Sequence, residues 1–320
     1  NLVFSGDAEA DATDVGGYGK TWSKRHYGGR PHSESVVILA QLQWPNRFNN
    51  NDQIWDLNEL EWVLLGDSFT HGACVNKGEN LASKIEYYSK KKVLNLGYSG
   101  NGPLLTYATG KEYLNNKKIK KLIYFYNSGN DFTDLEYELK SNYLQKYFTK
   151  AFRQNIDDPK IKKNVDSEIK KFIEKKYHKE SKYTLIQQIK LIKLRIKFLH
   201  QYIFKKDNLG DEIKEIDFKN EKYLRNIIEG LNDIANSNSG LMYFVYLPSY
   251  NNITLNSKQI IKEKNIINKI LISNQIKFID VHKLFLEQKN PEQFFPFGLY
   301  GHYNAQGYDY ISKYVVEQIN

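Results

Sequence analysis

Short apolar runs alternate with longer amphipathic stretches over most of this 320-residue chain, and this alternation limits the possible folds more than any other feature. Each short run is largely apolar throughout and is followed by a turn or small residues, which is typical of strands buried in a parallel sheet. The longer stretches repeat apolar residues at helical spacing. Strands are predicted at 62–65, 93–96, 121–126, 241–247 and 277–281. Helices are predicted at 80–90, 103–115, 221–236, 257–274 and 305–318.

The order of these elements predicts an α/β protein, with an open three-layer sandwich built on a mostly parallel five-stranded sheet. One connection is unusually long, because about 115 residues lie between positions 126 and 241, far more than a crossover helix needs. We therefore expect a helical insertion at about 135–218 within a domain that spans 59–320. Residues 1–58 are expected to form an N-terminal lead-in that is packed on or flanks this domain.

The net charge of +9 belongs to one segment of the chain. Residues 136–206 contain 19 Lys or Arg and 8 Asp or Glu, a balance of +11, which leaves −2 for the other 249 residues. No nucleic-acid recognition module accompanies this charge, so the sequence does not favour a nucleic-acid partner. The basic excess instead marks the predicted insertion.

Within the insertion, residues 185–204 have the pattern of a basic amphipathic helix. Apolar residues recur there at alternating steps of four and three, with lysines on a neighbouring face. Two interpretations remain open: a helix packed on its own domain with a solvated basic side, or a helix that contacts an anionic or membrane surface or covers the site as a lid. The apolar positions are Leu185, Ile189, Ile192, Ile196, Leu199 and Ile203.

The sequence carries no motif that indicates a resident metal or cofactor. Cys74 is the only cysteine, so a cysteine-based ligand set is impossible. There is also no pair of histidines four residues apart with an intervening glutamate, as a catalytic zinc helix would have. We therefore predict a site that works with side chains and backbone groups alone.

Polar turns follow three of the predicted strands, at the edge where an open α/β sheet carries its site. The first strand runs into Gly66-Asp67-Ser68, where Ser68 either caps the following helix or presents its hydroxyl above the sheet as a nucleophile. The second runs into a turn containing Gly100, either a plain glycine turn or a place where an N–H meets a developing oxyanion. The third ends near Asn130, whose amide offers a second donor.

A histidine near the C-terminus completes this set. His302 stands in a loop between the last strand and the last helix, from which it can reach the same edge and accept the Ser68 proton as a general base. His282, which directly follows the fifth strand, is its one serious rival.

Together these residues resemble the SGNH, or GDSL-type, hydrolase family, whose name refers to a Ser, a Gly, an Asn and a His in this order. The resemblance runs from about residue 61 to the C-terminus. It implies a flavodoxin-like sheet, with Ser68 as nucleophile and His302 as base. It also implies an oxyanion hole made by the Ser68 N–H, the Gly100 N–H and the Asn130 amide, with Asp67 and Asp131 in supporting positions.

One position departs from the family pattern. The family usually has an aspartate two or three residues before the histidine, where this chain has Tyr300 and Leu299. Such a carboxylate orients the imidazole and stabilises its charged form. Three alternatives follow: a backbone carbonyl near Leu299 holds the ring, Glu292 or Asp280 reaches it, or the enzyme is weak or inactive. We favour the carbonyl and a Ser-His dyad.

The sequence therefore predicts a serine esterase that works through an acyl-enzyme and needs no cofactor. Its expected substrate is a small-molecule, glycan or lipid-like ester. Acyl or O-acetyl groups of a carbohydrate or lipid-like molecule are the expected target. An O-acyltransferase would use the same site with a sugar hydroxyl in place of water. A non-catalytic binding or scaffold protein that keeps the fold is the alternative from another class.

Overall fold

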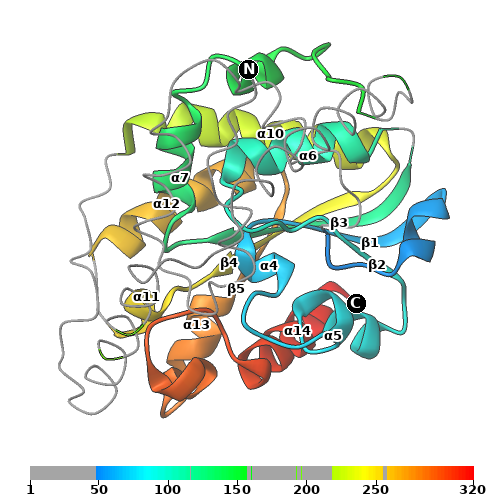
Figure 1. Cartoon of the computed structure of the whole chain (residues 1–320). Coiled ribbons are helices and arrows are strands. Elements are labelled where there is room, and N and C mark those ends of the chain that lie inside the picture. The colour runs from blue at the N-terminus through cyan, green and yellow to red at the C-terminus, as the bar shows by residue number, and fades with distance from the viewer. Residues whose placement is uncertain are drawn as a thin grey trace.

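The computed structural model describes residues 48–115, 117–156, 218–254 and 258–320, with three single positions between 156 and 218. Its centre is a five-stranded sheet in the order β2-β1-β3-β4-β5, with every neighbouring pair parallel (Figure 1). This is the flavodoxin-like strand order. The predicted α/β class and parallel sheet are confirmed. The strands are β1 (Glu59–Leu65), β2 (Val93–Asn95), β3 (Lys118–Asn127), β4 (Leu241–Leu247) and β5 (Lys277–Asp280).

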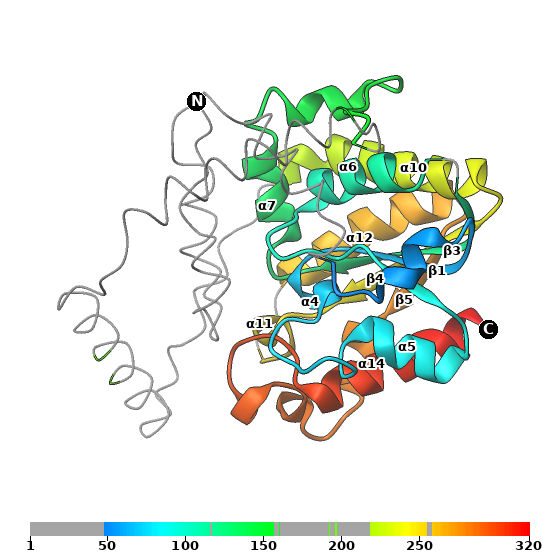
Figure 2. The same ribbon diagram turned by 45° about the vertical axis from the view of Figure 1, so that its right-hand side comes forward.

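Helices cover both faces of the sheet, so the molecule has the three expected layers (Figures 1 and 2). One layer contains α6 (Pro103–Tyr113), α7 (Asp131–Glu138), α10 (Glu221–Ser237) and α12 (Lys258–Ser273). The other contains α5 (Leu81–Ser89), α13 (Val281–Leu286) and α14 (Ala305–Ile319). Shorter helical turns are η2 (Asp52–Asp56), α4 (Ser68–His71), η3 (Leu144–Phe148), η4 (Phe218–Asn220), α11 (Tyr250–Thr254), η5 (Pro291–Phe294) and η6 (Pro296–Gly298).

A separate hydrophobic core lies on each face of the sheet, as the alternation of side chains along a strand requires. In β1, Val63 and Leu65 belong to the core under α6 and α10, whereas Trp62 and Leu64 belong to the core under α5 and α14. All four are fully buried. A strand buried on both faces must be apolar at every position, which is why this run showed no polar alternation.

The fifth strand ends one residue earlier than predicted, because a helix begins there. The prediction 277–281 included Val281, which instead opens α13. Asp280 is the N-cap of this helix, and its carboxylate accepts a hydrogen bond from the Lys283 N–H at 3.1 Å. The cap satisfies a backbone donor that the helix itself leaves unpaired.

Most of the predicted insertion at 135–218, including most of the basic stripe at 185–204, lies outside the described residues, as do residues 1–47 of the predicted lead-in. The described end of the lead-in contacts the sheet domain: Phe48 and Ile54 are buried in the core beneath α6. The Asn50 side chain bonds the Asn95 backbone on both its N–H and its C=O, each at 2.8 Å. No helix in the described ranges is long and apolar enough to cross a membrane.

Candidate active site

Ser68 occupies the first position of α4, immediately after β1. The cap of this short helix is Asp67, whose carboxylate accepts a hydrogen bond from the Phe69 N–H at 2.9 Å. Asp67 therefore has the capping role that the sequence left open for Ser68. The Ser68 hydroxyl is left to interact across the site.

That hydroxyl contacts His302, 234 residues further along the chain. Ser68 Oγ lies 2.7 Å from His302 Nε2. The imidazole packs against the Phe69 ring, with centroids 4.5 Å apart, and burial lowers the pKa of His302 to about 4. The ring is therefore neutral at neutral pH, and Nε2 can accept a proton from the serine.

Cys74 is the group that faces the other nitrogen of this imidazole. Its Sγ lies 3.6 Å from His302 Nδ1. The carbonyl near Leu299 that we favoured from the sequence does not hydrogen-bond this nitrogen within the described residues, and no described carboxylate forms an ion pair with His302. Cys74 was missed because a single cysteine six residues after the serine matches no recognised pattern. Its backbone is left-handed, with φ of 68°.

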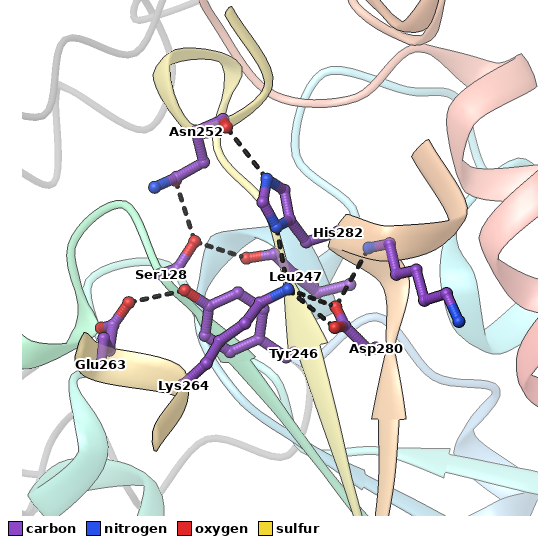
Figure 3. Close-up of polar contacts among 9 residues, drawn as sticks. Ser128, Tyr246, Leu247, Asn252, Glu263, Lys264, Asp280 and His282 are labelled. Carbon is purple, nitrogen blue, oxygen red and sulfur yellow. Dashed lines mark hydrogen bonds and ion pairs between the residues drawn. The ribbon is translucent and has the colours of Figure 1, made fainter. Parts of the chain in front are cut away.

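The rival histidine and one candidate acid lie together in another polar cluster (Figure 3). Lys264 Nζ donates to His282 Nδ1 at 2.8 Å and to the Asp280 carboxylate at 2.7 and 2.9 Å. The Nε2 of His282 donates to the Asn252 carbonyl at 3.0 Å. Burial and the nearby lysine lower the pKa of His282. Both His282 and Asp280 are thus engaged away from Ser68.

The turn containing Gly100 lies between β2 and α6. Gly100 has φ of 84°, a left-handed conformation that suits glycine. Among the described residues, its N–H and that of Ser68 donate to no protein acceptor. Two backbone donors thus remain at the edge of the sheet where the serine lies.

Asn130 is the N-cap residue of α7, three residues after the end of β3. Its side-chain Nδ2 donates to the Asp134 carboxylate at 2.6 Å, which holds the amide in place. Asp131 turns the other way and supports the turn: its Oδ2 accepts the Asn127 N–H at 3.0 Å and the Tyr124 hydroxyl at 3.4 Å.

Several carboxyl groups are buried behind these turns. Burial raises the pKa of Asp67 to about 6, that of Asp134 to about 7 and that of Glu138 to about 8. Burial and the charge of Asp67 raise the pKa of Asp131 well above its ordinary value. For Asp67, hydrogen bonds from Phe69, Asn127 and Asn130 partly oppose the rise in pKa that burial causes. Asp134 and Glu138 were not predicted from the sequence, although they follow Asn130 at helical steps of four.

No protein-family model and no curated protein matches the sequence, but solved structures do match the chain. An acetyl xylan esterase, AlAXEase, is 11% identical, with 82% of this chain and 100% of that chain covered and a TM-score of 0.47. A lipase/acylhydrolase from Enterococcus faecalis is 11% identical over 81% and 95% of the two chains, with a TM-score of 0.45. A lipolytic protein of the G-D-S-L family from Desulfitobacterium hafniense DCB-2 is 13% identical over 80% and 98% of the two chains, with a TM-score of 0.45.

Proposed function

We propose that this protein is a serine esterase that acts through an acyl-enzyme. The observation that carries the proposal is the 2.7 Å contact between Ser68 Oγ and His302 Nε2, a nucleophile and a base within hydrogen-bond reach. Burial keeps His302 neutral at neutral pH, so Nε2 is ready to accept a proton. The contact joins the first residue of α4 to the loop before α14, at the carboxyl edge of the sheet.

In the proposed reaction, His302 Nε2 takes the Ser68 proton while Oγ attacks the ester carbonyl. The carbonyl oxygen becomes an oxyanion, which the N–H groups of Ser68 and Gly100 would stabilise. The Asn130 amide would join them once one of its two hydrogens leaves the carboxyl group of Asp134 or Asp67. The imidazolium then protonates the leaving alkoxide. In the second half, water attacks the acyl group and gives a proton to His302. The imidazolium passes this proton to Ser68 Oγ as the Oγ–acyl bond breaks, which releases the acid and restores the serine. Cys74 would accept the Nδ1 hydrogen throughout.

The proposed substrate is an acyl or O-acetyl ester of a carbohydrate or lipid-like molecule. Two aromatic side chains support it, because Phe297 is 81% exposed and Tyr300 is 39% exposed on the loop that leads to His302. Such rings offer an apolar face to an acyl chain or to the C–H groups of a sugar. A sugar hydroxyl that replaced water in the second half would make the same site an O-acyltransferase.

The test combines covalent labelling with turnover. A fluorophosphonate probe should modify wild-type protein at Ser68, and p-nitrophenyl acetate should be hydrolysed. Ser68→Ala should abolish both, and His302→Ala should slow both strongly, because the serine would lose its base. Ser273→Ala, an exposed serine on α12, is the matched control and should behave as wild type. Turnover equal in all four proteins would refute the proposal.

A further inference from the structure

The two proposed oxyanion donors outside the nucleophile turn come from different parts of the chain. Gly100 lies in the turn between β2 and α6, and Asn130 lies at the start of α7 after β3. Donors in an oxyanion hole are effective only when they are held at hydrogen-bond distance from the position of the oxyanion before it forms. A link between α6 and α7 is therefore needed to keep the two turns in register.

Glu138, the last residue of α7, provides such a link. Its side chain is fully buried. Its Oε1 accepts the Gly102 N–H at 2.8 Å and the Leu105 N–H at 3.3 Å, and its Oε2 accepts the Leu104 N–H at 2.8 Å. Pro103 has no N–H to offer, so this one carboxyl group takes every N–H donor from 102 to 105. The N-cap residue of α6 is a glycine without a capping side chain, and Glu138 fills that role from another helix.

The same face of α7 holds the Asn130 amide. Asn130, Asp134 and Glu138 follow one another at steps of four residues, so they share one side of the helix. Asp134 accepts the Asn130 amide at 2.6 Å, and Glu138 anchors the turn that begins α6. A Cβ on Gly102 would lie 2.8 Å from both Asp134 Cβ and Glu138 Cδ. Glycine at 102 is thus what allows the two helices to approach so closely.

We propose that Glu138 is a positioning residue of the active site, which holds the Gly100 turn in register with Asn130 so that both donors reach one oxyanion. This inference rests on the proposed esterase function. Glu138 would not touch substrate. It would act through the backbone of residues 102–105 and, along the face shared with Asp134, through the placement of Asn130.

Glu112 offers a matched control, because it is also a buried glutamate that accepts backbone N–H groups from a distant segment. It is 3% exposed and accepts from the Gln154 N–H at 2.6 Å, the Ile156 N–H at 3.4 Å and the Tyr147 hydroxyl at 2.9 Å. These partners belong to η3 and the segment that follows it. A glutamine at 112 or 138 should lower the free energy of unfolding by comparable amounts, because each places an amide donor opposite N–H donors.

Kinetics separates the two sites. With p-nitrophenyl acetate, Glu138→Gln should lower kcat about 10-fold or more while KM stays within about 3-fold, because misplaced donors weaken only the transition state. Affinity for phenylboronic acid, which forms a tetrahedral adduct on a serine hydroxyl, should fall in parallel with kcat. Glu112→Gln should leave kcat, KM and this affinity near wild type.

Gly102→Ala gives a second route to the same displacement, should Glu138→Gln fold poorly. Its methyl group would push α6 away from α7, so kcat and boronate affinity should fall again, and the double variant should lose less than the product of the two single losses. If Glu138→Gln and Gly102→Ala fold and have the same kcat and boronate affinity as Glu112→Gln, the inference about Glu138 is wrong. That outcome would leave the esterase proposal intact. Wild-type turnover that does not depend on Ser68 would overturn the esterase proposal and this inference together.

Discussion

Replacing Cys74 with aspartate should raise the activity of this protein. The substitution puts a carboxylate where the structure has a sulfur 3.6 Å from His302 Nδ1. An Asp oxygen lies one bond further from Cβ than a Cys sulfur does, so it can shorten this gap. The left-handed backbone at position 74 tolerates Asp and Asn better than most other residues. Cys74→Asn is therefore a matched control without the charge.

The expected magnitude follows from the state of the imidazole. Burial lowers the pKa of His302 from 6.5 to about 4, and each unit corresponds to about 1.4 kcal/mol, so the imidazolium is disfavoured by about 3 kcal/mol. In the proposed mechanism, the attack of Ser68 creates this imidazolium. A charge-assisted hydrogen bond to a carboxylate contributes about 1.5–3 kcal/mol. Cys74→Asp should therefore raise kcat/KM by about 10- to 100-fold.

The assay is the pH profile of kcat/KM for p-nitrophenyl acetate. Only neutral His302 accepts the serine proton, so wild-type activity should be present above the His302 pKa and fall off near about pH 4. Cys74→Asp should raise the plateau and move the acid limb upward, because the carboxylate favours the charged ring. Cys74→Asn should keep the low acid limb. Identical profiles for the two folded variants would refute the placement of Cys74 at Nδ1.

Three further substitutions test the surroundings of the site. Burial raises the pKa of Glu263 to about 7, and the hydroxyls of Tyr126 and Tyr246 that donate to it only partly oppose this rise. The stability that the protonated form contributes is present at low pH and lost as the pH rises through that value. Glu263→Gln removes this titration, so the free energies of unfolding at about pH 5 and pH 8 should differ by about 2–3 kcal/mol less than in the wild type. Urea unfolding at the two pH values measures this difference. The same difference in variant and wild type would contradict the prediction. Asn252→Ala should lower the free energy of unfolding by about 1–3 kcal/mol, because its Oδ1 accepts the Ser128 hydroxyl at 2.8 Å in a buried site. A decrease in melting temperature no larger than that of an exposed Asn→Ala control would contradict this prediction. Asp67→Ala should remove the cap on the Phe69 N–H, cost about 1–2 kcal/mol in stability and lower kcat, since Ser68 sits on that turn; unchanged kcat in the folded variant would show that the cap does not position the serine.

The predicted strands agree with the structure because burial on both faces leaves a clear signature in the sequence. The fourth strand was predicted at 241–247 and is found at Leu241–Leu247. The first begins three residues before its prediction, at Glu59. Exposed positions such as Glu59 are held by pairing with β3, where Glu59 lies opposite Lys118, and pairing with a distant strand leaves no local pattern.

At the site, the sequence indicated His302 as the base for Ser68, with His282 as a rival, and left open which group holds the imidazole. Ser68 and His302 were both predicted from their places beside strands and helices, and the structure brings them to 2.7 Å. It separates His282, which bonds Lys264 and the Asn252 carbonyl. Both histidines follow β5 in the chain. The path of the chain between α13 and α14 decides that His302, and not His282, lies beside Ser68.

The amino-acid sequence by itself determined the α/β class, the order of the strands along the chain and the polar turns at their ends, because hydrophobic periodicity and turn residues are local properties. The tertiary structure decided that Cys74 faces His302 across 228 residues and that Glu138 caps α6 from 36 residues beyond Gly102. Contacts of this kind depend on how separate elements pack in space. No repeat or spacing in the chain encodes them, and they become visible only once the sheet and its two helical layers are assembled.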